Sequence, residues 1–188
     1  MSFAGIVIFV PACGDEAMLI VLGGLPGTGK TTIARELARA IDAVHIRIDS
    51  IEQAILESRL SPESADDAGY RVGYAVAEDN LRLGRTVIAD SVNPLPITRD
   101  SWLRVANRAQ VPVVEVEIEC TDTGEHRRRV EERFGDLPGL PALTWQDVVD
   151  REYQAWRREH LVIDTAGRTV EQCVTLLRAA LPVGSAVV

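Results

Sequence analysis

The sequence predicts an α/β fold in which a parallel five-stranded sheet lies between layers of helices. Short runs rich in Val and Ile alternate along the chain with longer amphipathic stretches. Such alternation is typical of a parallel sheet covered on both faces. The Val- and Ile-rich runs are nearly continuous in apolarity, as expected of strands buried on both faces. A chain of 188 residues suits a single domain of this kind.

The elements can be placed in order along the chain. Strands are predicted at residues 19–23, 44–49, 86–90, 113–120 and 161–164. Helices are predicted at residues 30–41, 50–59, 67–83, 99–109, 124–134, 144–156 and 169–181. The first helix carries Ile33 and Leu37 along one side, as an amphipathic helix should. Thr144 and Thr169 are expected N-caps, and Gln172 would complete a capping box with Thr169.

One domain is expected over residues 18–182, followed by a tail at residues 183–188. Residues 1–17 do not fit the strand and helix pattern, so they are assigned to an N-terminal extension that could be a strand or a tail. The cysteines Cys13, Cys120 and Cys173 are far apart and lack metal-ligand spacing. Reduced thiols in a cytoplasmic protein are therefore expected.

The charge balance and hydropathy limit the classes of partner. The net charge of −8 makes a long nucleic acid an unfavourable partner. No apolar run reaches the length of a membrane span, and the first residues lack the basic start of a secretory signal. The sequence therefore predicts no nucleic-acid or membrane partner, and it leaves a monomer and a homodimer both open.

A glycine-rich segment between the first strand and the first helix predicts a phosphate-binding loop. Its glycines would let backbone N–H groups surround phosphate oxygens, and the following helix N-terminus adds partial positive charge. The spacing of the motif in this strand and helix context is specific for ATP or GTP binding. The nucleotide-binding residues are expected to be Gly24, Leu25, Pro26, Gly27, Thr28, Gly29, Lys30, Thr31 and Thr32.

Lys30 is the only lysine in the chain, whereas the other 19 basic residues are arginines. A general arginine bias can reflect codon composition alone. The remaining lysine nevertheless stands where its ammonium can reach the β- and γ-phosphates, and the hydroxyl of Thr31 beside it can bind Mg²⁺.

Two carboxylates end later apolar strands. Asp90 closes the run at residues 86–90 and would hold Mg²⁺ opposite Thr31, although it could instead cap the turn before Asn93. Asp49 closes the run at residues 44–49, at the sheet edge where ligands bind. It could accept or orient the proton of a substrate hydroxyl, and it could also serve as the N-cap of the next helix.

The phosphate-binding loop, Asp49, Asp90 and the order of the helices resemble the P-loop small-molecule kinases related to nucleoside-monophosphate kinases. This group includes shikimate kinase, gluconate kinase, chloramphenicol phosphotransferase and adenylylsulfate kinase. The resemblance extends from Met18 to Leu181. It implies a P-loop NTPase fold with the strand order 2-3-1-4-5, a mobile lid at about residues 122–145, and ATP with Mg²⁺ as cofactors.

The segment after the fourth strand is where such kinases carry lid arginines. His126, Val130 and Phe134 recur every four residues and form one stripe of the expected helix. If this stripe faces inward, Arg129 and Arg133 are best placed to neutralise the transferring phosphoryl group. The alternative is an exposed helix held by pairs between Glu and Arg four residues apart.

The region at residues 50–83 occupies the place where this group binds its phosphoryl acceptor. Its first turn lacks the arginine that would bind an acceptor phosphate, which favours a hydroxyl acceptor. The polar and aromatic candidates in and around this region are Arg47, Arg59, Tyr70, Arg71, Tyr74, Asn93, Pro94 and Arg99.

The sequence therefore predicts an ATP-dependent kinase that transfers the γ-phosphate to a small molecule, with Lys30, Asp49, Arg129 and Arg133 as catalytic residues. A nucleotide or adenylylsulfate kinase with an anionic acceptor is the alternative, and a nucleotide-binding regulatory ATPase is a third. A GTP-dependent switch is excluded because its guanine motif requires a second lysine. The identity of the acceptor is left open.

Overall fold

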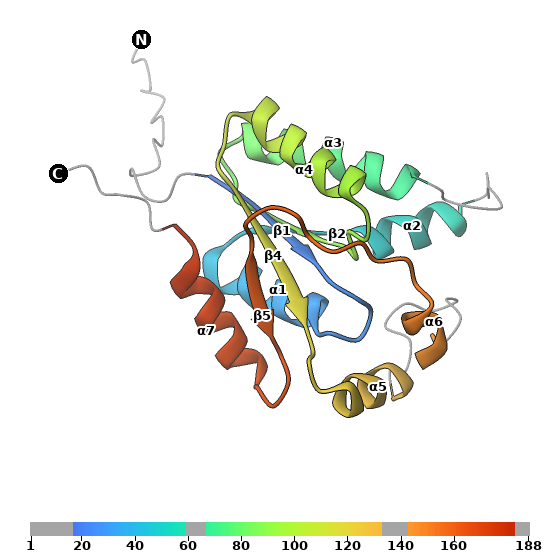
Figure 1. Cartoon of the computed structure of the whole chain (residues 1–188). Coiled ribbons are helices and arrows are strands. Elements are labelled where there is room, and N and C mark those ends of the chain that lie inside the picture. Colours follow the sequence, from blue (N-terminus) through green and yellow to red (C-terminus); the bar gives the residue numbers. More distant parts are fainter. Residues whose placement is uncertain (1–16, 59–66, 133–142, 183–188) are drawn as a thin grey trace, which may run out of the picture.

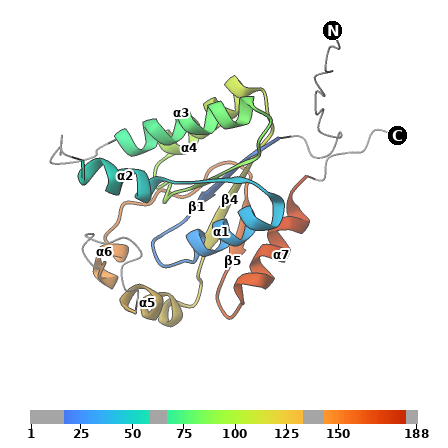
Figure 2. The ribbon, with the colours of Figure 1, turned by 180° about the vertical axis from the view of Figure 1, so that it is seen from behind.

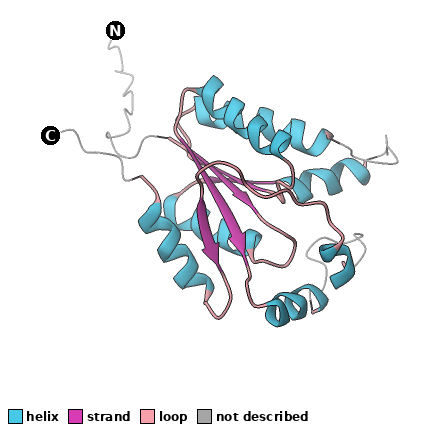
Figure 3. Ribbon diagram, in the orientation of Figure 1, coloured by secondary structure: helices cyan, strands magenta, loops and turns pink. Residues whose placement is uncertain are grey.

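The computed structural model describes residues 17–58, 67–132 and 143–182. Five strands form one sheet in the order β2-β3-β1-β4-β5, and every neighbouring pair is parallel. The strands are β1 (Leu19–Gly23), β2 (Val44–Arg47), β3 (Val87–Asp90), β4 (Val113–Glu119) and β5 (Leu161–Asp164). The predicted fold class and strand order are confirmed. All five strands end at the same edge of the sheet (Figure 3).

The helices form two layers around this sheet (Figure 1 and Figure 2). One layer contains α3 (Ala68–Arg82) and α4 (Pro96–Ala109), with α2 (Ile48–Leu56) packed beside α3. The other contains α1 (Lys30–Ile41) and α7 (Val170–Ala180). The short helices α5 (Thr123–Glu131) and α6 (Trp145–Val149) lie together beyond the ends of the strands.

Each face of the sheet contributes to a separate hydrophobic cluster. Ile20, Leu22 and Ile88 face α1 and α7, whereas Val21 and Trp102 belong to the cluster under α3 and α4. Alternate residues of one strand thus enter opposite clusters, which explains why the strands read as continuous apolar runs. Burial on both faces makes the edge at which the strands end a rigid base for a site.

Several helix boundaries depart from the sequence prediction for identifiable reasons. Helix α4 begins at Pro96 rather than Arg99, because proline is compatible with the first helical position. Helix α2 begins at Ile48 because that side chain is buried in the cluster beside α3. Thr144 and Thr169 are N-caps, as predicted, and Thr169 forms the predicted capping box with Gln172. Thr144 also forms a capping box, with Asp147, which the sequence analysis did not predict.

The largest departure is in the segment predicted as one helix at residues 144–156. Helix α6 ends at Val149, and residues 150–160 run without regular structure to β5. In Figure 1 this segment, which we call the strap, crosses the sheet on the side of α4. Arg158 of the strap binds Asp100 of α4 and Glu115 of β4, so tertiary pairing replaces helical hydrogen bonding there.

Across the described ranges no helix is both long and apolar enough to span a membrane. Cys120 and Cys173 are buried free thiols, in agreement with the prediction for these two residues, and Cys13 lies outside the described residues. The expected extension at residues 1–17 and the tail at residues 183–188 lie almost entirely outside them as well.

Candidate active site

The glycine-rich loop joins the end of β1 to the start of α1, as the sequence predicts. Gly24, Gly27 and Gly29 have φ angles of 135°, 84° and 96°, which are rare for residues with a side chain. A Cβ on Gly24 would lie 2.2 Å from the carbonyl oxygen of Ile118, and one on Gly27 would lie 2.5 Å from Val130 Cγ2. Both conformation and space therefore require glycine, and the first turn of α1 contains no acidic residue that would repel a phosphate.

The side chain of Lys30 is held by a backbone carbonyl group of the phosphate-binding loop. Its Nζ donates a hydrogen bond of 2.7 Å to the carbonyl oxygen of Leu25, and the Thr28 hydroxyl donates one of 2.9 Å to the same oxygen. Lys30 is buried, with 7% of its surface exposed. Because an ammonium carries three protons, Lys30 can keep this bond and still donate to a phosphate oxygen. Thr31 is partly buried next to it, whereas Thr32 is exposed on α1.

Asp90 lies at the end of β3 and is buried, with 2% of its surface exposed. Burial alone would raise its pKa, but a hydrogen bond from His45, the charge of Lys30 and the hydroxyl of Thr31 together lower the pKa below its ordinary value. The carboxylate is therefore ionised at neutral pH, and it shares its surroundings with Lys30 and Thr31. The structure brings together the three side chains that the sequence assigned to phosphate and metal.

The residues at this position fit a magnesium ion. Mg²⁺ prefers oxygen ligands and usually keeps several waters when it binds together with substrate phosphates. Thr31 and Asp90 offer one hydroxyl and one carboxylate next to the phosphate-binding loop. Among the described residues, no group of three or more His, Cys, Asp or Glu side chains forms a closed metal cage. A metal supported mainly by phosphate and water matches this arrangement.

Asp49 does not end a strand as predicted. Strand β2 ends at Arg47 and α2 starts at Ile48, so Asp49 lies in the first turn of that helix. The helix N-cap is Arg47, which makes the alternative N-cap role for Asp49 wrong. Arg47 stands opposite Asp90 in the sheet register, so Asp49 lies just beyond Asp90 at the same edge. Its side chain is 41% exposed and lies 3.4 Å from the guanidinium of Arg47.

Glu52 is a carboxylate that the sequence analysis did not select. It follows Asp49 by three residues, which places both on one side of α2. Burial, followed by the negative charge of Asp49, raises the pKa of Glu52 to about 7, while Arg151 of the strap lowers it. A Cβ on Gly69 would lie 2.3 Å from Glu52 Cγ, so Glu52 fills the contact between α2 and α3. Spacing from Asp49 was the only signal for it in the sequence.

Several acceptor-side candidates have structural roles instead. The Asn93 amide donates to the carbonyl oxygen of Leu22 and accepts from Trp102 Nε1, both in the core. Arg99 is buried and donates to the carbonyl oxygens of Asn93 and Gln154. Tyr74 donates to the carbonyl oxygen of Thr98. These contacts fix the turn after β3. Tyr70 and Arg47 are candidates that interact with acids of α2.

Tyr70 lies beside the polar residues that follow β3. Its hydroxyl accepts a hydrogen bond of 3.2 Å from the backbone N–H of Asn93. The Tyr70 pKa is raised to about 12, mainly by burial. The charges of Glu52 and Asp49 contribute to this rise, and a hydrogen bond with Ser91 offsets part of it. Tyr70 therefore stays neutral near both acids. Arg71 is exposed on α3, and Arg59 lies outside the described residues.

Two of the three residues in the expected inward stripe of α5 are buried in the structure. His126 and Val130 are buried, and Phe134 lies outside the described residues. His126 Nε2 lies 2.8 Å from the carbonyl oxygen of Pro26, and Val130 contacts the position of Gly27. Helix α5 thus supports the phosphate-binding loop directly, a role that the sequence analysis did not assign to His126.

Arg129 lies on the same helix but is bound away from the phosphate-binding loop in this structure. Its guanidinium donates 2.7 Å to Thr165 Oγ1 and 3.0 Å to the Thr165 carbonyl oxygen, and it pairs with Glu125 at 2.5 Å. The predicted Glu125–Arg129 pair is therefore present. Thr165 donates in turn to the carbonyl oxygen of Thr28, which links Arg129 to the loop through one residue. Arg133 lies outside the described residues.

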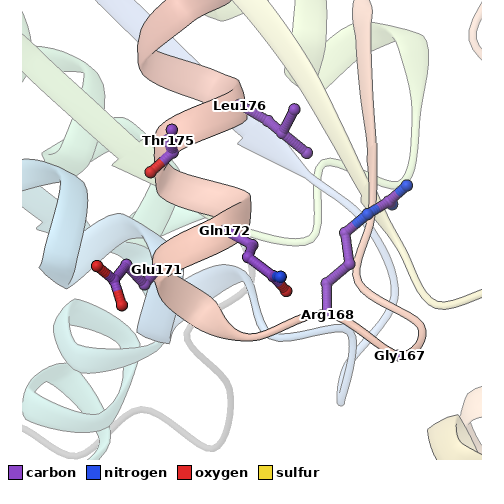
Figure 4. Close-up of a pocket in the computed structure, with 6 residues that line it drawn as sticks. All are labelled: Gly167, Arg168, Glu171, Gln172, Thr175 and Leu176. Carbon is purple, nitrogen blue, oxygen red and sulfur yellow. The ribbon is translucent and has the colours of Figure 1, made fainter.

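An open depression lies elsewhere, on α7. It has a volume of about 510 Å³ and begins at Gly167, in the turn after β5. Figure 4 shows the side chains of Arg168, Gln172 and Leu176 on one side of α7 and those of Glu171 and Thr175 on the other. Since these side chains do not converge, the depression offers no alternative catalytic group.

Known proteins with related sequences include kinases that are named for different acceptors. The chain is 21% identical over 174 residues to the adenylyl-sulfate kinase of Synechococcus sp. JA-3-3Ab, covering 89% of this chain and 96% of that protein. It is 26% identical over 186 residues to the cytidylate kinase of Methanopyrus kandleri, covering 88% and 93% of the two chains.

Solved structures share the same fold. The APS kinase of Mycobacterium tuberculosis, in complex with AMPPNP and APS, superposes with a TM-score of 0.66 at 17% identity, covering 88% of this chain and 97% of that one. A gluconokinase from Sinorhizobium meliloti superposes with a TM-score of 0.59 at 19% identity, covering 88% and 95%. A family profile described as AAA domain (AAA_33) matches residues 19–151. The chain, with its phosphate-binding loop and its kinase relatives, therefore belongs to this AAA domain family and is a P-loop phosphotransferase.

Proposed function

We propose that this protein transfers the γ-phosphate of ATP to a hydroxyl group of a small molecule. The observation that carries the proposal is the meeting of Lys30, Thr31 and Asp90 at the phosphate-binding loop, with Asp49 next along the same sheet edge. A group that can bind the donor phosphates and a carboxylate that can receive a proton are thus available at the same edge of the sheet, as transfer of a γ-phosphate requires.

The donor side consists of the loop and its lysine. The backbone of residues 24–29 and the N-terminus of α1 would bind the phosphates, with Lys30 on the β- and γ-phosphates. Thr31 and Asp90 would hold Mg²⁺, which neutralises phosphate charge when bound. Arg129 would leave Thr165 to approach the γ-phosphate when the lid closes, and Arg133 would act with it. The segment at about residues 122–145 would be this lid.

The acceptor side depends on Asp49. The acceptor hydroxyl would lose its proton to the Asp49 carboxylate while its oxygen attacks the γ-phosphorus. The bond from the γ-phosphorus to the bridging oxygen breaks, and ADP leaves. Asp49 suits this role because its side chain is partly exposed at the sheet edge.

An anionic acceptor is the second candidate, since relatives include an adenylyl-sulfate kinase and a cytidylate kinase. The first turns of α2 disfavour it. They present Asp49 and Glu52, and the neighbouring Arg47 is directed to Asp49 at 3.4 Å. Two carboxylates would repel a phosphate or sulfate at this position. We therefore favour an acceptor that is a neutral or basic hydroxyl compound.

The test combines one variant with one panel of acceptors. Asp49→Asn should lower turnover by about 100-fold or more, because a positioned general base contributes on this order. Its affinity for MgATP should stay within about twofold of the parent, because Asp49 belongs to the first turn of α2 and not to the phosphate-binding loop. ADP release should be measured with sugars, amino alcohols, nucleosides, antibiotics, nucleotides and adenylylsulfate.

Asp67→Asn is the matched control, because Asp67 is an exposed aspartate at the N-cap position of α3 whose side chain makes no capping hydrogen bond. It should leave both measurements unchanged. Full turnover in Asp49→Asn would rule out the proton-accepting role. Stimulation by nucleotides or adenylylsulfate alone would establish the anionic acceptor instead.

A further inference from the structure

Asp90 makes a direct contact with His45, a histidine that has no role in the proposed reaction. His45 is the second residue of β2, and its Nε2 lies 3.1 Å from Asp90 Oδ2. In the parallel register His45 stands opposite Ile88 and Arg47 stands opposite Asp90. His45 and Asp90 therefore project from the same face of neighbouring strands, which places the imidazole directly behind the carboxylate.

The direction of this hydrogen bond follows from the chemistry of the partners. An ionised carboxylate only accepts hydrogen bonds, so the proton of this contact must lie on His45 Nε2. The neutral tautomer protonated at Nε2 and the imidazolium both satisfy that condition. The contact consequently does not depend on the charge of His45. It depends only on a donor at the position of Nε2.

The contact uses one of the two oxygens of Asp90. With Oδ2 accepting from His45, the carboxylate still has acceptor capacity for other groups, and Lys30 and Thr31 act on the same carboxylate. The side chain of Asp90 is 3% exposed and that of His45 is 18% exposed, so bulk water competes little with their hydrogen bond. A carboxylate without such a partner could rotate about its terminal torsion, which has a broad energy minimum.

We propose that His45 is a positioning residue that fixes Asp90 in the orientation required to hold the magnesium ion. The inference rests on the proposed metal role of Asp90, and it adds a residue that acts on the metal only through Asp90. Outer-shell partners of this kind typically change metal affinity by 10- to 100-fold when they are removed.

The chain offers a matched control in a second histidine and carboxylate pair. His160 Nε2 lies 3.1 Å from Glu117 Oε2, and its side chain is 15% exposed. The distance and the burial are nearly those of the pair between His45 and Asp90. This second pair joins the strap to β4 and does not include Asp90. Replacing His160 tests the general effect of losing a hydrogen bond between a largely buried histidine and a carboxylate.

The experiment measures metal binding without turnover. Mn²⁺ is titrated into the full chain saturated with ADP, with no acceptor present, and bound Mn²⁺ is followed by electron paramagnetic resonance. His45→Leu should weaken Mn²⁺ binding by about tenfold, His45→Gln should stay within about threefold because its amide can donate, and His160→Leu should match the parent. The affinity for ADP in EDTA should be the same in all four proteins.

Parent-like Mn²⁺ affinity in His45→Leu would overturn the inference. An equal loss of ADP affinity in EDTA would also overturn it, since His45 would then only shape the phosphate-binding loop. If His45→Leu fails to fold, His45→Asn takes its place, because its shorter amide stays polar but does not reach Asp90. No acceptor is used, so a failure of the kinase proposal would leave this result intact. Absence of Mn²⁺ binding in the parent would instead reject the metal site itself.

Discussion

At the scale of single residues, the burial of Glu52 near the proposed site lowers the stability of the fold when this side chain is ionised. It lies against Gly69 of α3, one helical turn from Asp49. Burial and the charge of Asp49 raise its pKa to about 7, and Arg151 offsets only part of this. A carboxyl group with a raised pKa binds its proton more tightly in the folded than in the unfolded chain, so folding weakens as pH rises from about 4.5 to about 7.

Replacing Glu52 with glutamine should therefore stabilise the protein at high pH. Glutamine keeps the shape of the protonated acid and never acquires the charge. Urea unfolding at pH 8 should give a free energy of unfolding for Glu52→Gln about 1 kcal/mol above the parent, a value reduced for partial exposure. The difference should vanish below pH 4.5, where the parent is protonated in both states.

Glu78→Gln provides a control of opposite sign. Hydrogen bonding to Arg108 lowers the pKa of Glu78, so this variant should lose stability at neutral pH and regain parental stability in acid. A gain in Glu52→Gln that is independent of pH would contradict the ionisation of Glu52 as its cause.

At the scale of elements, the strap supplies partners for two of the three glutamates of β4. Glu115, Glu117 and Glu119 alternate with apolar residues along β4, and in the sheet register Glu115 lies beside Val21, a member of the cluster under α3 and α4. On that face the strap supplies Arg158 to Glu115, and Tyr153 and His160 to Glu117. A polar strand face thus requires a polar covering segment, which the strap provides in place of a helix.

Removing Arg158 should destabilise the fold by leaving Glu115 buried without its cation. Glu115 is 7% exposed, and Arg158 also binds Asp100 of α4 at 2.6 Å. We expect Arg158→Leu to lower the free energy of unfolding by about 2–3 kcal/mol, measured by urea denaturation. Adding Glu115→Gln to this variant should recover part of the loss, because the uncompensated charge disappears.

Arg85→Leu is the comparison for an exposed ion pair. Arg85 faces Asp42 with both side chains exposed, and such pairs contribute little. Its stability should change by less than about 0.5 kcal/mol. A similar small change in Arg158→Leu would show that the strap is not held by its ion pairs.

At the scale of the whole molecule, nucleotide binding and global unfolding are linked through the position of Lys30. The loop, β1 and α1 belong to the centre of the fold, so a ligand bound there should stabilise all of it. At a MgATP concentration about 100 times its dissociation constant, the free energy of unfolding should rise by about 2.7 kcal/mol.

Lys30→Met should abolish this gain, whereas Arg39→Met should keep it. Both residues lie on α1, but Arg39 is an exposed cation paired with Glu36. Urea unfolding of each variant with and without MgATP measures the effect. A full gain in Lys30→Met would show that the nucleotide binds elsewhere.

Much of this fold could be predicted from local sequence. Apolar runs predicted the strands, and the spacing of the glycines predicted the phosphate-binding loop. Both depend on backbone geometry that a few neighbouring residues specify. The positions of Lys30 and Thr31 followed from the same motif, and Asp90 was selected as the carboxylate that ends an apolar strand. The order of the strands came from the resemblance to known kinases, since an alternating pattern alone does not specify which strands are neighbours.

The parts that local sequence did not determine depend on contacts between distant residues. His45 approaches Asp90 across 45 positions of the chain, and Arg158 approaches Glu115 across 43. Neither pair leaves a periodic signal in its own segment. The sequence by itself determined a parallel sheet and a loop that binds phosphate, because backbone conformation and burial are set locally. Only the tertiary structure decided which side chains support that loop and its carboxylates, because packing selects partners that chain spacing does not reveal.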